Sequence, residues 1–157
     1  MLDRRRFLTV LAASGAALAA RPAWAEASLP KVIVSKDPNC GCCSGWVDHM
    51  RAAGFPVEVV PTPELDEVKT RLGVPRDLAS CHTAEVEGYV IEGHVPADAV
   101  RRVLAEKPRA KGLAVPGMPV GSPGMEVEGT APEAYEVILF GPSGRATFAR
   151  YRGTRAL

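Results

Sequence analysis

Short apolar runs alternate with segments of helical periodicity along most of the chain. Runs that are rich in β-branched residues and bounded by Pro, Gly or Asn predict strands, at 31–34, 56–60, 84–86, 89–91, 135–140 and 146–151. Apolar positions that recur at three- and four-residue steps predict helices, at 42–53, 62–72 and 96–106. The order strand, helix, strand, helix, hairpin, helix predicts a single α/β domain of the thioredoxin-like type, with an additional C-terminal β-hairpin.

One long stretch follows neither period. Residues 112–129 are rich in Gly, Pro and Met and show neither alternation nor a helical repeat. A segment of this length without secondary structure is usually functional or disordered. The sequence therefore predicts a Gly/Pro/Met-rich loop before the final hairpin, and this loop carries two thioether side chains, Met118 and Met125.

The first 25 residues have the order of a secretory signal. Arg4, Arg5 and Arg6 precede an apolar run at 7–20, and a small-x-small cleavage site ends at Ala25. As a helix the run would span roughly 21 Å, short of the ~30 Å core of a bilayer, so we expect a cleaved leader and no anchor. Its start resembles the twin-arginine pattern, with a Sec leader as the alternative. We expect residues 26–157 to form one domain in the periplasm.

The charge of that domain excludes some partners. The whole chain has 19 Lys+Arg and 18 Asp+Glu, and the leader holds four of the basic and one of the acidic residues. Residues 26–157 therefore carry 15 basic and 17 acidic side chains, a formal charge of −2. No basic field remains for nucleic acid or an anionic membrane, and no further apolar stretch predicts membrane insertion after cleavage.

All four cysteines follow the leader, and three of them, Cys40, Cys42 and Cys43, fall within four residues, with Cys81 as the fourth. Structural disulfides are common in exported proteins. Bridged Cα atoms lie about 4.4–6.8 Å apart, however, and adjacent ones about 3.8 Å, so Cys42 and Cys43 are poor partners. A second interpretation is a Cys40-x-x-Cys43 redox pair at a helix N-terminus. The additional Cys42 argues against it, because a third thiol would trap unproductive mixed disulfides.

A metal site is the interpretation that uses every cysteine. Thiolates are soft ligands that select copper(I), zinc or iron–sulfur clusters. The separated cysteine pairs typical of zinc sites are absent. Several copper(I) ions shared by bridging thiolates would form a cluster of nearly neutral total charge, and a neutral cluster costs less free energy to bury. His94, Met118 and Met125 are further candidate ligands, whereas we do not include His49 and His82.

The chain also resembles a known family. The segments that carry the resemblance are DPNCGCC (37–43), WVDH (46–49), SCHT (80–83), GYVIEGHVP (88–96) and VPGMPVGSPGME (115–126). They are similar to segments of the periplasmic copper-resistance proteins of the CopG type, many of whose relatives are known only as a domain of unknown function or as metal-binding proteins. The resemblance extends over residues 31–151. It implies a thioredoxin-like fold and a multinuclear, cysteine-bridged copper site with Cys40, Cys42, Cys43 and Cys81 as ligands.

We therefore expect a periplasmic protein that sequesters or relays copper(I) in copper resistance, with one or several bound ions. Its expected partners are metal ions and, as candidates, other periplasmic copper-handling proteins. The alternative is a thiol or copper oxidoreductase of the thioredoxin-like type. Binding is favoured over catalysis, and no catalytic residue is assigned.

Overall fold

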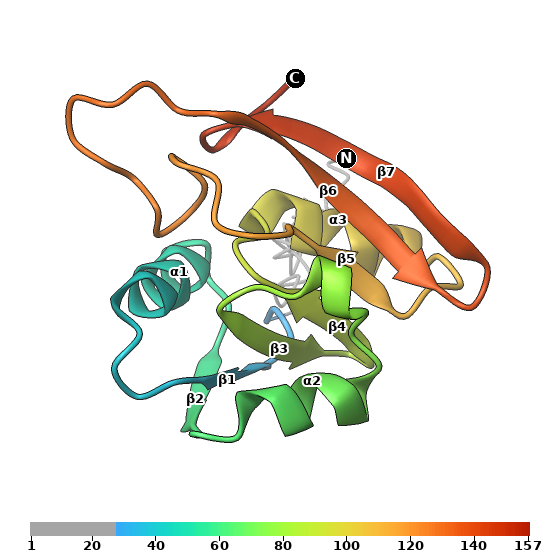
Figure 1. Ribbon diagram of the computed structural model, residues 1–157. Helices are drawn as coiled ribbons and strands as arrows, with labels where there is room; N and C mark the ends of the chain where they lie inside the picture. The colour runs from blue at the N-terminus through green and yellow to red at the C-terminus, as the bar shows by residue number, and fades with distance from the viewer. Residues whose placement is uncertain (1–27) are drawn as a thin grey trace, which may run out of the picture.

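The computed structural model describes residues 28–157, so the predicted signal peptide lies outside the described residues. The described part forms one mixed α/β domain with an eight-stranded sheet and three α-helices (Figure 1). Its elements are, in chain order, β1 (Val32–Lys36), α1 (Gly41–Ala52), β2 (Val57–Pro61), α2 (Leu65–Leu72), a 3-10 turn (Arg76–Leu78), β3 (His82–Val86), β4 (Tyr89–Glu92), α3 (Ala97–Glu106), β5 (Gly112–Ala114), β6 (Ala134–Gly141), β7 (Gly144–Arg152) and β8 (Arg155–Ala156).

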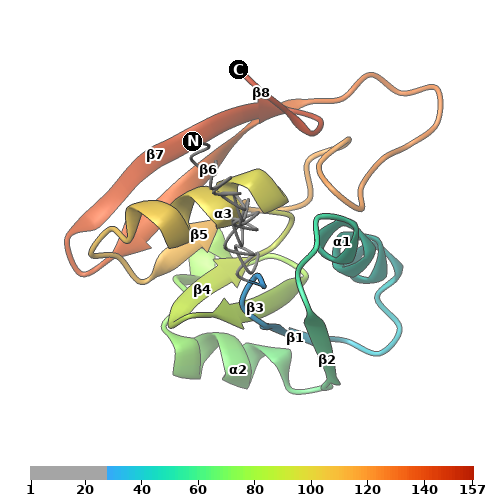
Figure 2. The same cartoon turned by 180° about the vertical axis from the view of Figure 1, so that it is seen from behind.

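The strand order in the sheet is β2-β1-β3-β4-β5-β6-β7-β8. The pairs β1–β2 and β4–β5 are parallel, and the other neighbours are antiparallel. Helix α2 covers one face of the first strands, and α1 and α3 lie on the other face (Figures 1 and 2). Strand β7 also packs against α3, because the hydroxyl of Tyr151 donates to Asp98 and Arg102 stacks on the ring of Phe148.

The turn between β3 and β4 follows directly from its sequence. Glu87 and Gly88 both have positive φ, 48° and 82°, as a two-residue hairpin of the favoured twist requires. Helix α2, by contrast, begins two residues later than predicted, because the sequence suggested Thr62 as its N-cap and the N-cap is Glu64. The hydroxyl of Thr62 accepts from the N–H of Glu64 and forms a local turn, so the first helical residue is Leu65.

The prediction of a loop without secondary structure over residues 112–129 is wrong at its start. Residues Gly112–Ala114 form β5, a buried strand between β4 and β6. Three residues are too few to show a period of either kind, and their pairing partners lie far away in the chain. The rest of the stretch contains neither helix nor strand.

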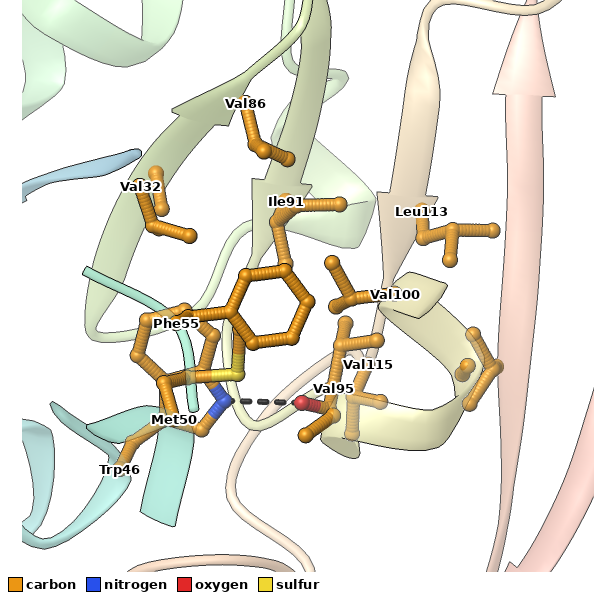
Figure 3. Packing of buried hydrophobic residues seen from close by; sticks show 14 of the residues in the cluster. Val32, Trp46, Met50, Phe55, Val86, Ile91, Val95, Val100, Leu113 and Val115 are labelled. Carbon is orange, nitrogen blue, oxygen red and sulfur yellow. Dashed lines mark hydrogen bonds between the residues drawn. The ribbon is translucent and has the colours of Figure 1, made fainter. Parts of the chain in front are cut away.

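The hydrophobic core anchors α1 to the sheet (Figure 3). Trp46 and Met50 of this helix are fully buried, with Ile91 and Leu113 from the sheet. The indole N–H of Trp46 donates to the carbonyl of Val95 over 2.8 Å, so the ring also has its polar group satisfied. Within residues 28–157, no helix is long and apolar enough to cross a bilayer.

Candidate metal centre

The sheet topology brings the distant cysteines together. Cys40 precedes the first turn of α1, which contains Cys42 and Cys43. Cys81 comes directly before β3. Because β1 and β3 are antiparallel neighbours, with Lys36 opposite His82, the end of β1 and the start of β3 lie at the same sheet edge.

At this edge the four cysteine sulfur atoms all lie within 4.8 Å of one another. The Sγ atom of Cys42 is 3.4 Å from that of Cys40 and 3.7 Å from that of Cys81. The Sγ atom of Cys43 contacts the carbonyl oxygen of Cys81 at 3.4 Å. We call these four residues the cysteine cluster.

Two of these sulfur atoms differ from the expectation of four thiolates. Cys40 and Cys43 are joined by a disulfide, whereas Cys42 and Cys81 are free. One helical turn separates the paired residues and sets their Cα atoms 5.4 Å apart, within the bridging range of about 4.4–6.8 Å. The structure therefore holds the cluster in an oxidised state, and a four-thiolate site requires its reduction.

His94 faces the cluster with an unprotonated nitrogen. Its Nε2 lies 2.9 Å from Sγ of Cys81, and its Nδ1 lies 2.8 Å from the carbonyl oxygen of Pro123. A carbonyl can only accept, so Nδ1 carries the proton, and burial lowers the pKa of His94 and keeps the ring neutral. The lone pair of Nε2 is thus available to a thiol proton or to a metal ion.

The Gly/Pro/Met-rich segment orients the ring of His94 through the carbonyl of Pro123. Its Gly124 packs on the first turns of α1, where an added Cβ would lie 2.5 Å from the backbone nitrogen of Trp46 and 2.6 Å from the oxygen of Cys42. This contact holds the neighbouring Pro123 carbonyl against the histidine ring.

The two methionines of this segment are less enclosed. Met118 is 52% exposed and Met125 is half-buried. The carbonyl of Gly117 accepts from the hydroxyl of Ser80, so the segment beside Met118 is tied to the residue that precedes Cys81. Both thioethers remain predicted ligands.

His82 is a residue of the site that the sequence analysis did not include. It is fully buried, its Nδ1 lies 3.5 Å from Sγ of Cys81, and its ring centroid is 4.5 Å from that of Trp46. Its Nε2 has no hydrogen-bond partner in the described part of the chain, which is a costly and uncommon arrangement for a buried polar atom. Donor atoms of Cys81, His82 and His94 also lie within 4.8 Å of one another. The available signal was the adjacency of His82 to Cys81.

Burial raises the pKa of Cys81 to about 12, and the neighbouring Cys42 adds to the shift. At neutral pH Cys81 is therefore a thiol that can donate to Nε2 of His94. A metal ion that binds this sulfur displaces its proton. Free thiols beside neutral imidazoles form a soft donor set, and this set fits copper(I).

A buried ion pair holds the segment around Cys81 in place. The Nζ atom of Lys69 lies 2.5 Å from Glu92 and 2.9 Å from the hydroxyl of Thr83, and both charged side chains are nearly inaccessible to solvent. The Glu92 carboxylate also accepts from the N–H of Ser80, 2.6 Å away, and from the hydroxyl of Thr83. These bonds fix the residues on both sides of Cys81.

Comparison with known proteins identifies the family of the chain. A family described as "Protein of unknown function, DUF411" matches residues 78–125, the segment with Cys81 and both buried histidines. No curated protein matches the chain. A solved structure described as copper resistance protein CopG, form 2, is 44% identical, with a TM-score of 0.74 over 78% of this chain and 98% of that chain. Form 1 is also 44% identical, with a TM-score of 0.73 over 80% and 99%. At this identity over nearly the full length of both structures, the chain belongs to the CopG copper-resistance family.

Proposed function

We propose that the chain is exported to the periplasm, loses residues 1–25, and there sequesters or relays copper(I) as part of copper resistance. The observation that carries this proposal is the convergence of four cysteine sulfur atoms within 4.8 Å, from segments 38 residues apart. The similarity to solved structures named for copper resistance supports it.

The reduced site would hold several copper(I) ions. Four thiolates around one monovalent ion would leave a large negative charge in a half-buried site, whereas ions bridged by shared sulfur atoms approach neutrality. The N-terminus of α1 assists, because Cys40 makes no side-chain cap and the first-turn N–H groups can face thiolate charge. His94, Met118 and Met125 would complete the coordination.

We further assign the domain to the thioredoxin-like type. The sub-sheet order β2-β1-β3-β4, with α1 and α3 on one face and α2 on the other, supports this assignment. Strands β6 and β7, an antiparallel pair beyond this unit, would be the additional hairpin.

A second function has one observation in its favour. The Cys40–Cys43 disulfide lies at the N-terminus of α1, and Sγ of Cys42 is 3.4 Å from Sγ of Cys40. Such an arrangement suits thiol–disulfide exchange, in which a thiolate attacks a disulfide sulfur. Turnover of insulin disulfides by the reduced protein would support this function.

The test of copper binding is an anaerobic copper(I) titration of fully reduced residues 26–157, with metal analysis of the loaded protein. Wild type should bind more than one ion per chain, and Cys42→Ser should lose most of them because Cys42 is central to the cluster. Ser44→Ala, an exposed change two residues after Cys42 in the same helix, is the matched control and should bind like wild type. Equal stoichiometry and affinity in wild type and Cys42→Ser would refute the proposal.

A further inference from the structure

The disulfide removes two donors from the cluster and leaves a second set intact. With Cys40 and Cys43 joined, Cys42 and Cys81 remain free. Nε2 of His94 stays within 2.9 Å of Cys81, held by the Pro123 carbonyl. Neither histidine contact depends on the paired cysteines.

The spacing of this second set suits a single ion. Two thiolates that bind one tetrahedral ion at about 2.3 Å are separated by about 3.8 Å. The Sγ atoms of Cys42 and Cys81 lie 3.7 Å apart with no adjustment. A thiolate and an imidazole on the same ion are separated by about 3.5 Å, so His94 needs to withdraw by about 0.6 Å when an ion replaces the thiol proton. Nδ1 of His82 lies 3.5 Å from Sγ of Cys81, which already matches the separation of a thiolate and an imidazole on one ion.

The geometry points to a site that works in two states. In the disulfide state Cys42, Cys81 and His94 bind one copper(I) ion; in the reduced state Cys40 and Cys43 join them and the capacity rises. Reduction by an external dithiol, which leaves as its own disulfide, converts the first state into the second. The Cys40–Cys43 pair therefore controls how many ions the protein carries. This inference rests on the proposed copper(I) binding and adds its dependence on the redox state of the pair.

The test compares three proteins by anaerobic copper(I) titration against a chromophoric copper(I) chelator. They are reduced wild type, wild type with the disulfide intact, and Cys40→Ser/Cys43→Ser. The last two should each bind one ion per chain, and reduced wild type should bind more. Alkylation and mass spectrometry after titration should show the disulfide unchanged. The double variant keeps the inference testable if the disulfide form proves hard to isolate.

Two further variants locate the ion. Adding Cys81→Ser to the double variant should abolish binding, and adding His94→Gln should weaken it at least tenfold, while circular dichroism shows both still folded. Retention of the ion after Cys81→Ser, or no binding by the disulfide form while the reduced form binds, would overturn the inference and leave the proposed function standing. Equal capacity in the two states would also overturn it. Absence of binding in every form would instead refute the proposed function.

Discussion

Replacing Gly124 with alanine should lower both the stability of the protein and its affinity for copper(I) at the proposed site. Gly124 has a φ of 85°, a left-handed conformation, and lies against the backbone of α1. A Cβ would lie 2.5 Å from the nitrogen of Trp46 and 2.6 Å from the oxygen of Cys42. Both are backbone atoms of a helix anchored by a fully buried indole, so neither can turn away.

The expected loss of stability in Gly124→Ala has two parts that a control variant can separate. A left-handed non-glycine residue costs about 1–2 kcal/mol. Overpacking against rigid neighbours adds about 1–3 kcal/mol. Gly129, in the same segment, has a φ of 76° and no atom within 4 Å of an added Cβ. Gly129→Ala should therefore lose only the first part, and Gly124→Ala should be less stable than Gly129→Ala by about 1–3 kcal/mol.

Equilibrium unfolding of the reduced, metal-free variants in urea measures this difference. Copper(I) titration of the same variants adds a second readout, because a displaced Gly124 moves the Pro123 carbonyl away from His94. Gly124→Ala should bind copper(I) more weakly than wild type, and Gly129→Ala should match wild type. If the two variants lose equal stability and bind copper(I) alike, the close packing of this segment on α1 does not support the site as we describe.

Other expected outcomes concern buried polar groups. Burial lowers the pKa of His82 well below 6.5. Below pH 6.5 the unfolded chain therefore takes up a proton that the native state excludes. The free energy of unfolding should then decrease by up to about 1.4 kcal/mol for each pH unit below 6.5. Urea unfolding of metal-free protein at several pH values should show this slope, and a His82→Gln variant with the same slope would contradict it. Lys69→Met should lower the free energy of unfolding by about 3–5 kcal/mol, because it leaves Glu92 charged and buried. The double variant Lys69→Met/Glu92→Leu should recover much of this loss in the same assay. If the losses of the two single variants simply add in the double variant, the two side chains are not coupled. Trp46→Phe should cost about 1–3 kcal/mol in thermal unfolding because the Val95 carbonyl loses its donor, and an unchanged melting temperature would show that this bond is dispensable.

The mixed α/β class and the helices could be predicted because their signals are local. Helix α1 shows its period in Trp46 and Met50, and the β3–β4 hairpin shows its turn in Glu87-Gly88. Strand β5 could not be predicted, since its three residues become a strand only by pairing with β4 and β6. The same holds for the two-residue β8.

Residue chemistry indicated part of the site, and tertiary contacts supply the rest. His94 was a candidate ligand from its residue type, but its proton position depends on Pro123, 29 residues away. His82 was not included as a ligand, but Cys81 lies just before β3, where the strict alternation of a strand does not hold, and its sulfur comes within 3.5 Å of the His82 ring. The pairing of Cys40 with Cys43 was one of the alternatives that residue types alone left open.

The spacing of the cysteines means that oxidation and metal loading act differently on the folded chain. The disulfide closes a loop with a sequence separation of 3, and by loop entropy such a closure contributes about 2 kcal/mol. An ion held by both Cys42 and Cys81 closes a separation of 39 and contributes about 4 kcal/mol by the same reasoning. A bound ion would therefore stabilise the contact between α1 and β3 more than the disulfide does. We expect the metal-free protein to be more susceptible to proteolysis than the metal-bound protein.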